Sequence, residues 1–378
     1  MAHPDVVFGL TGDVRRNSRA LRQLRALQSL GCTVEVLTFG PPGEEIGERL
    51  RLRVLPKPSG GGPRFFARVH QLFRQEALRT PARVYHASDL FTLPAMHAAA
   101  RQHGGRLVYD ARELYPHVGA TAGRPWARLF WYLIEGLYIR RADAVLTVNE
   151  SIAGRLARVY RIARPTVIPN TPPTQPVART NWLREQTGLS EEKVLVLYQG
   201  YLKKGRGCER LIEAMPEVRG AALVFLGEGP LQPVLEAQVR RLGLEQRVRF
   251  LPMVPPDKLL HATASADVGA CLIEGITLSL RLALPNKLFE YLMAGLPVLA
   301  SDLPELRRVV AGYDVGLLVD WQDQAALVRA LQEMTQHPER RVQWAGHAPR
   351  VLETFNWEAA SERLQRIYRD LLTAPARL

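Results

Sequence analysis

Short apolar runs alternate with helix-length amphipathic segments along the whole chain, and this alternation constrains the fold most. The segment 18–31, for example, repeats leucine at helical spacing and ends at Gly31, a typical helix stop. Alternating strand and helix signals are typical of parallel sheets with helices on both faces. The expected strands lie at 5–10, 34–39, 83–88, 106–111, 144–149, 166–170, 194–200, 222–227, 248–251, 268–273, 297–301 and 315–320.

The alternation is interrupted once, by the proline-rich stretch 170–180, which we interpret as a linker. A chain of 378 residues usually needs more than one core, so two α/β domains of similar size are expected. We place the boundaries at 1–172 and 173–355, with a last amphipathic helix within 356–378. Doubly wound domains bind ligands at the carboxyl ends of their strands, so we expect a cleft there.

Several classes of protein are disfavoured by the sequence. The first residues show no basic segment followed by an apolar run, so we expect no signal peptide. No apolar run approaches the roughly 20 residues that a membrane span needs. The three cysteines are widely separated, which indicates reduced thiols in the cytosol rather than a disulfide frame or a zinc site.

The segment PNKLFEY (285–291) predicts a helix whose first turn binds an anion. Pro285 suits that turn because its missing N–H is not needed there. Asn286, Lys287 and Leu288 offer backbone N–H groups at the positive end of the helix dipole, and Lys287 adds a full charge. Glu290 follows about 5 Å further along the helix and suits a ribose diol. The alternative is an ordinary amphipathic helix with surface charges.

Two glycine-containing turns follow expected strands of the second half. The first, in YQGYLKKGRG (198–207), combines flexible backbone with three cations, which suits a phosphate; a flexible surface turn is the alternative. The second, in FLGEGPL (225–231), offers a carboxylate for a sugar or base, with a plain turn as the alternative. The residues concerned are Gly200, Lys203, Lys204, Gly205, Arg206, Gly207, Glu228 and Gly229.

The excess positive charge of the chain lies in its first half. Residues 1–180 contain 26 Lys and Arg residues against 13 Asp and Glu residues, whereas residues 181–378 contain 24 of each. Such asymmetry indicates an anionic partner, such as a membrane surface, a nucleic acid or an acidic substrate; an arginine-rich composition is the alternative. The segments 63–79 and 124–141 suit helices lying on an anionic bilayer, or else core helices. No nucleic-acid-binding module is recognisable, so we expect no such partner.

These motifs together resemble the retaining glycosyltransferases of family 4, the glycosyl transferases of group 1. The likeness covers nearly the whole chain and is strongest in LPNKLFEYLMAGLPVLASDLPE (284–305). RRADAVLTVNESIA (140–153), VIPNTP (167–172) and GDVRRNSRALRQLRALQSLG (12–31) are also similar to family segments. The resemblance implies an α/β protein of the GT-B fold, with two Rossmann-like doubly wound domains facing a central cleft. The first would bind the acceptor and the second the donor, and the last helix would pack back on the first.

The donor-side roles that the resemblance implies fall on the second half. Arg206 occupies the usual Lys position of a Lys-Gly pair that contacts the donor diphosphate. Tyr201 replaces the family's arginine, and Lys203 or Lys204 would supply the missing charge. Glu290 matches the ribose ligand. The family's other glutamate would fall on Leu282, so that Asn286 or Lys287 would contact the donor instead.

On the sugar and acceptor side, the family's Asp-Ala-His-Glu segment corresponds to residues 110–113, where Arg112 replaces the histidine. We therefore predict Arg206, Lys287 and Arg112 as catalytic residues and Asp13 as an acceptor-side residue. The predicted donor-binding residues are Gly12, Gly200, Lys203, Lys204, Glu228, Gly229, Asn286, Leu288 and Glu290.

The implied reaction is transfer of a hexose from a nucleotide-diphosphate sugar to a hydroxyl of a glycan or lipid-linked acceptor, with retention. No cofactor and no metal are expected. We expect a cytoplasmic protein, with peripheral binding to the inner face of the cytoplasmic membrane through the basic half as a further expectation. The alternatives are a nucleotide-sugar epimerase or hydrolase of the same fold, or a catalytically weak partner protein that binds the donor.

Overall fold

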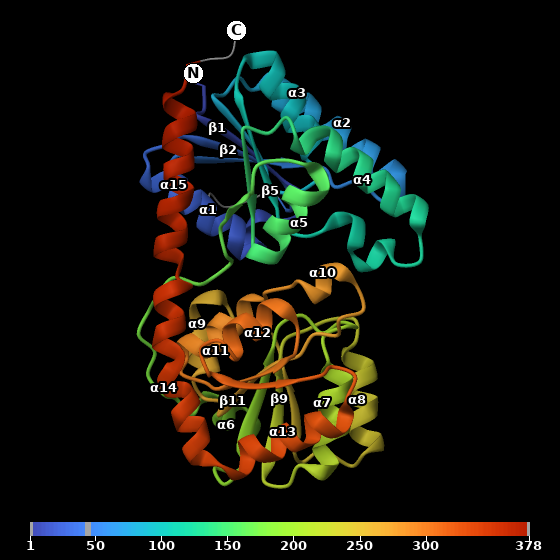
Figure 1. The fold of residues 1–378 in the computed structure, drawn as a ribbon, viewed down its shortest axis with the longest axis vertical. Helices are drawn as coiled ribbons and strands as arrows, with labels where there is room; N and C mark the ends of the chain where they lie inside the picture. The colour runs from blue at the N-terminus through green and yellow to red at the C-terminus, as the bar shows by residue number, and fades with distance from the viewer. Residues whose placement is uncertain (1–2, 42–46, 376–378) are drawn as a thin grey trace. The chain divides into compact units, whose positions relative to one another are not determined.

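The chain forms two compact units in a computed structural model that describes residues 3–41 and 47–375 (Figure 1). Unit 1 comprises the chain up to Pro169 together with the segment from Glu358 onward, and unit 2 comprises Asn170–Trp357. Each unit contains one parallel sheet covered by helices. The α/β class predicted from the alternation is therefore confirmed.

The sheet of unit 1 has the strand order β3-β2-β1-β4-β5-β6-β7, and its paired strands are parallel. The order reverses between β1 and β4, which makes the sheet doubly wound and places the switch point at the carboxyl ends of these strands. The strands are β1 (Val6–Leu10), β2 (Val34–Phe39), β3 (Leu50–Leu55), β4 (Val84–Ala87), β5 (Arg106–Ala111), β6 (Ala144–Thr147) and β7 (Thr166–Val167).

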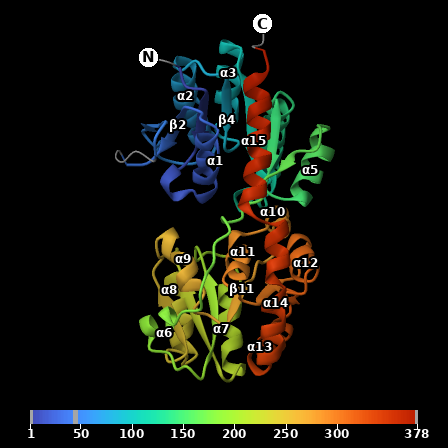
Figure 2. The same cartoon turned by 90° about the vertical axis from the view of Figure 1, so that its left-hand side faces the viewer.

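Helices cover both faces of this sheet, with α1 and α15 on one face and α2, α3 and α4 on the other (Figures 1 and 2). The helix α5 packs beside α4, because Tyr160 of α5 donates a hydrogen bond to Glu135 of α4. The helices are α1 (Ser18–Ser29), α2 (Gly62–Arg79), α3 (Leu93–His103), α4 (Pro125–Ile139), α5 (Glu150–Tyr160) and α15 (Trp357–Thr373), with the 3-10 turns Val14–Arg16, Tyr115–His117 and Gly119–Thr121.

The last helix, α15, is part of unit 1 although it follows unit 2 in the sequence. The Tyr368 hydroxyl lies 2.6 Å from Nδ1 of the buried His86 on β4. Gln365 donates a hydrogen bond of 2.7 Å to the Ser29 hydroxyl at the end of α1. These contacts hold the C-terminal helix against strand β4 and helix α1 of the same unit (Figure 2).

Unit 2 repeats this architecture with the strand order β10-β9-β8-β11-β12-β13. Its strands are β8 (Val194–Gln199), β9 (Ala221–Leu226), β10 (Val248–Leu251), β11 (Val268–Cys271), β12 (Val298–Ser301) and β13 (Gly316–Val319). Its helices are α6 (Trp182–Thr187), α7 (Cys208–Ala214), α8 (Gln232–Arg241), α9 (Pro256–Thr263), α10 (Leu278–Arg281), α11 (Asn286–Met293), α12 (Pro304–Val310), α13 (Gln324–Gln336) and α14 (Pro338–Thr354), with a 3-10 turn at Met215–Glu217.

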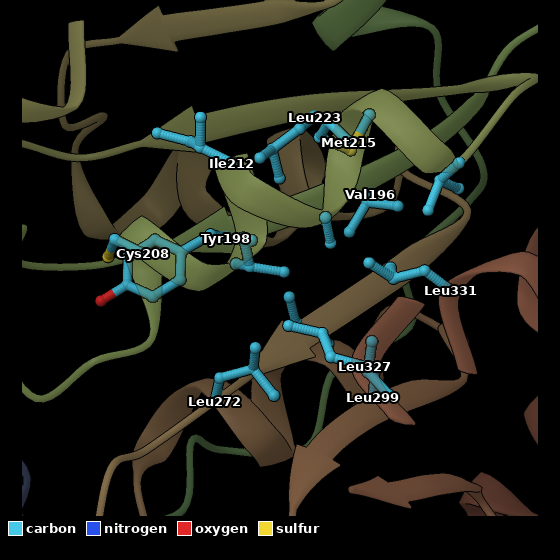
Figure 3. Packing of buried hydrophobic residues seen from close by; sticks show 14 of the residues in the cluster. Val196, Tyr198, Cys208, Ile212, Met215, Leu223, Leu272, Leu299, Leu327 and Leu331 are labelled. Carbon is cyan, nitrogen blue, oxygen red and sulfur yellow. The ribbon is translucent and has the colours of Figure 1, made fainter. Parts of the chain in front are cut away.

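Strand β8 lies inside the sheet of unit 2 and contributes side chains to two cores. Val196 and Tyr198 pack with α7, α8 and α13 in the cluster shown in Figure 3, whereas Leu195 and Leu197 pack toward α9, α11 and α12. This split follows from the two-residue period of a strand. Because both faces of β8 are buried, its carboxyl end is held firmly between two helical layers.

Most expected strands and helices are confirmed, and the stretch 170–180 contains no helix or strand, as expected for a linker. Strand β3 was missed. The three cysteines are free, as expected, and the structure places all three in buried positions. None of the helices in residues 3–41 and 47–375 has the length and apolarity needed to cross a bilayer.

The structure gives different outcomes for the two segments that the sequence predicted as membrane-binding helices. In α2, the apolar side chains Phe66, Val69 and Phe73 are buried in unit 1, so the membrane interpretation of 63–79 is wrong and its core alternative is correct. In α4, by contrast, a row of apolar side chains remains exposed. These are Trp126 (62% exposed), Leu129 (58%), Leu133 (64%) and Leu137 (48%).

Candidate active site

The carboxyl end of β8 and the first turn of α11 meet in unit 2, and this junction is the centre of the candidate site. Gly200 follows β8 directly, and a Cβ atom placed there would lie 3.7 Å from Cε and from Nζ of Lys287. Gln199, the last residue of β8, donates a hydrogen bond of 2.5 Å from its side-chain amide to Glu290 on α11. The fold thus brings Gly200 close to Lys287 and Glu290, which follow it by 87 and 90 positions in the sequence.

Lys287 holds its ammonium group in an unusual environment. The Nζ atom lies 3.4 Å from the centroid of the Tyr198 ring. It is shielded from solvent and has no hydrogen-bond partner among the described residues, although the residue as a whole is only partly buried. Burial lowers the pKa of Lys287 to about 8, and the nearby positive charge of Arg206 acts in the same direction. A buried ammonium without a hydrogen-bond acceptor is a place where an anion would be strongly favoured.

The helix dipole of α11 adds to this positive field. Pro285 occupies the N-cap with extended backbone, and no acidic residue stands in the first turn. The N–H of Leu288 already donates to the Pro285 carbonyl at 3.2 Å. The N–H groups of Asn286 and Lys287 are therefore better candidates for an anion than that of Leu288.

The loop between β8 and α7 carries the remaining cations of the predicted phosphate site. Lys203 and Lys204 are exposed, and Arg206 is partly buried. Gly207 has a φ of +68°, and a Cβ there would lie only 2.5 Å from Cβ of Leu272, so only glycine fits this turn. The turn brings Arg206 close enough to Lys287 for its charge to be felt there.

The turn after β9 packs directly against this loop. The N–H of Leu202 donates to the Glu228 carbonyl at 2.8 Å, and a Cβ at Gly229 would lie 2.1 Å from the Leu202 carbonyl oxygen. A glycine is therefore required at Gly229 for the two backbones to approach. The Glu228 side chain is exposed, so the structure leaves it available to a ligand.

Other predicted residues lie at the carboxyl ends of β1 and β5 in unit 1. Gly12 follows β1, and its carbonyl accepts a hydrogen bond of 2.6 Å from the Thr38 hydroxyl. Asp13 is paired with Arg15 at 2.9 Å, and this hydrogen bond holds the pKa of Asp13 below its usual value. The carboxylate of Asp13 is thus paired with a cation two residues away in the same loop.

Arg112, after β5, lies 3.8 Å from Asp89 in an ion pair, and its side chain is 21% exposed. Asp89 is buried and also accepts hydrogen bonds from the N–H of Thr11 at 2.8 Å and from the Thr11 hydroxyl at 2.6 Å. It therefore ties the loop that contains Gly12 to Arg112. Asp89 and Gln199 could not be recognised from the sequence, because only the folded sheet shows what their side chains contact.

The two substitutions noted in the family motifs take different positions. Tyr201 is 60% exposed on the loop after β8, and its carbonyl accepts a hydrogen bond of 3.3 Å from the Tyr198 hydroxyl. Leu282 lies at the C-cap of the short helix α10. In the described ranges, no group of three or more His, Cys, Asp or Glu side chains is arranged to hold a metal ion.

Comparisons with known proteins match both units. The model of the family described as Glycosyltransferase Family 4 matches residues 17–175, and that described as Glycosyl transferases group 1 matches residues 180–351. The D-inositol 3-phosphate glycosyltransferase of Corynebacterium urealyticum is 29% identical over 250 residues, which are 63% of this chain and 57% of that protein. The chain thus spans little more than half the length of this curated relative.

Solved structures share the fold over nearly the whole chain. Sucrose-phosphate synthase from Thermosynechococcus elongatus superposes with a TM-score of 0.79 at 20% identity, covering 98% of this chain and 99% of that one. HepE of Anabaena, solved with UDP-glucose, gives a TM-score of 0.75 at 16% identity, covering 97% of this chain and 100% of that one. At these identities the likeness concerns the fold. Together with the two family models, it shows that the chain belongs to the group 1 glycosyltransferases and has the GT-B fold.

Proposed function

We propose that this protein transfers a hexose from a nucleotide-diphosphate sugar to a hydroxyl of a glycan or lipid-linked acceptor, with retention of configuration. The observation that carries the proposal is the buried ammonium of Lys287, which lies in the first turn of α11 without a hydrogen-bond partner in the described structure. A diphosphate would supply the missing acceptor. Glu290, one turn further along the same helix, is spaced to accept hydrogen bonds from a ribose diol.

The chemistry follows from where charge develops. When the bond between the sugar and the diphosphate breaks, negative charge grows on the leaving oxygen. Positive groups already fixed there stabilise the transition state more than the bound substrate. Lys287, Arg206 and the N–H groups at the start of α11 would provide this stabilisation. In the proposed reaction the departing phosphate oxygen accepts the proton of the attacking hydroxyl on the same face of the sugar, so no separate general base is needed.

The family membership and the solved complex of HepE with UDP-glucose support a nucleotide sugar as donor. An epimerase or hydrolase of the same fold would release or convert the nucleotide sugar without any acceptor. A catalytically weak partner protein would bind the donor and transfer nothing. Donor turnover that depends on an added acceptor therefore separates the proposed function from both alternatives.

Substitutions at the two ends of the proposed donor site should have different kinetic effects. A thermal-shift panel of UDP, GDP and ADP sugars first selects the donor, since a bound ligand raises the unfolding temperature. We expect Glu290→Ala to raise the donor KM about tenfold, because a hydrogen bond to a charged group is lost. Arg206→Ala should lower kcat by about tenfold, less than for a fully buried charge because water screens this side chain. Unchanged donor kinetics in both variants would remove the site assignment.

We also propose that unit 1 binds an anionic membrane surface through the exposed row Trp126, Leu129, Leu133 and Leu137, called here the α4 stripe. Helix α4 packs on α2 through Phe66, whose ring centroid lies 5.1 Å from that of Trp131, so the stripe faces away from this contact. Exposed arginines, Arg124 and Arg141, flank the ends of α4. An apolar face bordered by cations is typical of a helix lying in the interface of an anionic bilayer.

Vesicle flotation tests whether the α4 stripe binds an anionic membrane. We expect wild-type protein to float with vesicles containing phosphatidylglycerol and not with pure phosphatidylcholine. Leu133→Glu should lower the bound fraction by roughly tenfold, since burial of one leucine side chain is lost. Val342→Glu is the matched control, because Val342 is a 73% exposed apolar residue on α14 of unit 2 and receives the same charge. Equal binding of both variants would contradict the proposal.

A further inference from the structure

Gln199 joins the end of β8 to helix α11 through two hydrogen bonds. Its backbone N–H donates to the Tyr291 hydroxyl at 2.9 Å, and its side-chain amide donates to Oε2 of the neighbouring Glu290 at 2.5 Å. Gln199 is 2% exposed and Tyr291 is fully buried. A single residue of the strand therefore contacts two neighbouring side chains of α11, the Tyr291 hydroxyl and the carboxylate that the proposed function assigns to the ribose.

The orientation of the Gln199 amide is fixed from its other side. The Thr263 hydroxyl, fully buried at the end of α9, lies 2.8 Å from Oε1 of Gln199 and donates to it. An ionised carboxylate only accepts hydrogen bonds, so the amide nitrogen must face Glu290 and the amide oxygen must face Thr263. Thr263, Gln199 and Glu290 thus form a chain of hydrogen bonds, in which the Thr263 hydroxyl shares its single proton between Oε1 of Gln199 and the Leu259 carbonyl, 2.7 Å away.

A carboxylate can accept more hydrogen bonds than the one that Gln199 donates to Glu290. A carboxylate offers about four lone-pair directions on its two oxygens, and the amide of Gln199 uses one of those on Oε2. Fixing the plane of the carboxylate matters because two adjacent hydroxyls can be bound together only in one orientation. A freely rotating carboxylate would lose this advantage, since its rotamers would have to be ordered on binding.

We infer that Gln199, oriented by Thr263, is a positioning residue that makes Glu290 selective for ribose over 2′-deoxyribose in the donor. The inference rests on the proposed function, because it presupposes a nucleotide at this site. It does not involve the diphosphate subsite, which is built from Lys287, Arg206 and the first turn of α11. Ribose selectivity and diphosphate affinity should therefore respond separately to changes at Gln199.

Isothermal titration with matched ligands tests this separation. The probes are whichever of UDP, GDP and ADP the wild type binds, its 2′-deoxy counterpart, and inorganic pyrophosphate. We expect the wild type to prefer the ribonucleotide by about tenfold or more, as for a hydrogen bond to a charged group. Gln199→Met, which keeps the volume and removes both polar atoms, should reduce this preference to roughly threefold or less while pyrophosphate affinity is retained.

The controls make the outcomes distinct. Gln238→Met is a matched control, because Gln238 is also a buried glutamine of unit 2 that donates to a carboxylate, that of Glu213 at 3.3 Å. It should leave the preference unchanged. Thr263→Val should also lower the preference for the ribonucleotide over its 2′-deoxy counterpart. If Gln199→Met does not fold, this variant tests the inference in its place.

Two results would overturn the inference. One is an unchanged ribose preference in Gln199→Met and Thr263→Val. The other is a parallel loss of ribonucleotide and pyrophosphate affinity, which would mean that Gln199 only supports the local fold. If the wild type binds none of the three nucleotides, the proposed function fails together with this inference, whereas binding with an unaltered preference overturns the positioning role alone.

Discussion

Replacing Lys287 with methionine is expected to lower kcat by about 100- to 1000-fold, the loss typical for a group that stabilises developing charge. The reason lies in the burial of the ammonium. Its Nζ atom is shielded from solvent and faces the Tyr198 ring at 3.4 Å, so in the proposed reaction its charge would act on the leaving diphosphate with little screening by water. Affinity for the nucleoside diphosphate should fall as well, by about 10- to 100-fold.

The same substitution should stabilise the free protein. Burial lowers the pKa of Lys287 from 10.5 to about 8, so at pH 7 the charged lysine destabilises the folded state by an amount of the order of 3 kcal/mol. Methionine fills a similar volume without the charge. We therefore expect Lys287→Met to unfold at a higher denaturant concentration than the wild type, a change opposite in sign to its effect on catalysis.

The pH dependence of this stability difference follows from the pKa values. Below pH 8 the lysine is protonated in both the folded and unfolded chains, so the destabilisation is fully present. Between pH 8 and 10.5 the folded state loses its proton first, and stability rises relative to the variant. Urea denaturation at pH 7 and at pH 9.5 should therefore show a smaller difference at the higher pH.

The control for both effects is Lys258→Met, which removes the same charge from an exposed position on α9. We expect it to change kcat and stability little. If Lys287→Met bound the nucleotide as tightly as the wild type, the ammonium would not be the diphosphate ligand. If it lowered stability instead, the lysine would already have a partner in the free protein.

Much of the fold could be predicted because buried parallel strands have a strong signature. The strands β1, β8 and β9 are covered on both faces and therefore form nearly continuous apolar runs. Strand β3 (Leu50–Leu55) alternates leucine or valine with Arg51 and Arg53 and lies at the sheet edge. It was missed because Arg53 is satisfied by Glu35 at 2.7 Å and by Glu76 at 2.6 Å, contacts that no local pattern reveals.

The candidate site shows the same division between local and distant information. The first turn of α11 could be recognised because Pro285, Lys287 and Glu290 lie within one short motif. The role of Gln199 could not be recognised, because its partner Glu290 is 91 positions away.

The two segments proposed as membrane-binding helices could not be told apart by sequence either, since 63–79 and 124–141 both have helical apolar periodicity. Only packing shows that α2 buries its apolar face and that α4 leaves the α4 stripe exposed.

The second large effect is expected for Asp110→Ala, which should destabilise unit 1 by about 3–5 kcal/mol. Asp110 is fully buried at the end of β5 and accepts hydrogen bonds of 2.7 Å from both Nε and Nη2 of Arg19. Gln23 adds a third at 3.0 Å. Burial by itself would raise the pKa of Asp110, but the charge and hydrogen bonds of Arg19 outweigh burial and hold that pKa below its usual value.

Removing the carboxylate leaves the guanidinium of Arg19 buried without its counter-charge, and this is why the loss of stability should be large.

Two charged residues of the segment that corresponds to the family's Asp-Ala-His-Glu therefore have different surroundings in this chain. Asp110 points into unit 1 and joins β5 to α1, whereas Arg112, two residues later, pairs with Asp89 at the carboxyl edge of the sheet. We therefore expect the effect of Asp110→Ala on activity to follow the loss of folded protein.

Calorimetry with two reference variants measures the contribution of burial. The double variant Arg19→Met with Asp110→Leu should recover at least half of the lost stability, because no unpaired charge remains. Asp302→Ala breaks the pair of Asp302 with Arg307, which has similar short bonds of 2.6 and 2.5 Å but is exposed, and it should destabilise by less than about 1 kcal/mol. The stability advantage of the wild type over the Asp110 variant should also shrink as the pH falls below 4, because Asp110 then takes up a proton in the unfolded chain before it does so in the folded protein. Equal losses for Asp110→Ala and Asp302→Ala would show that the buried pair does not anchor α1 to the sheet.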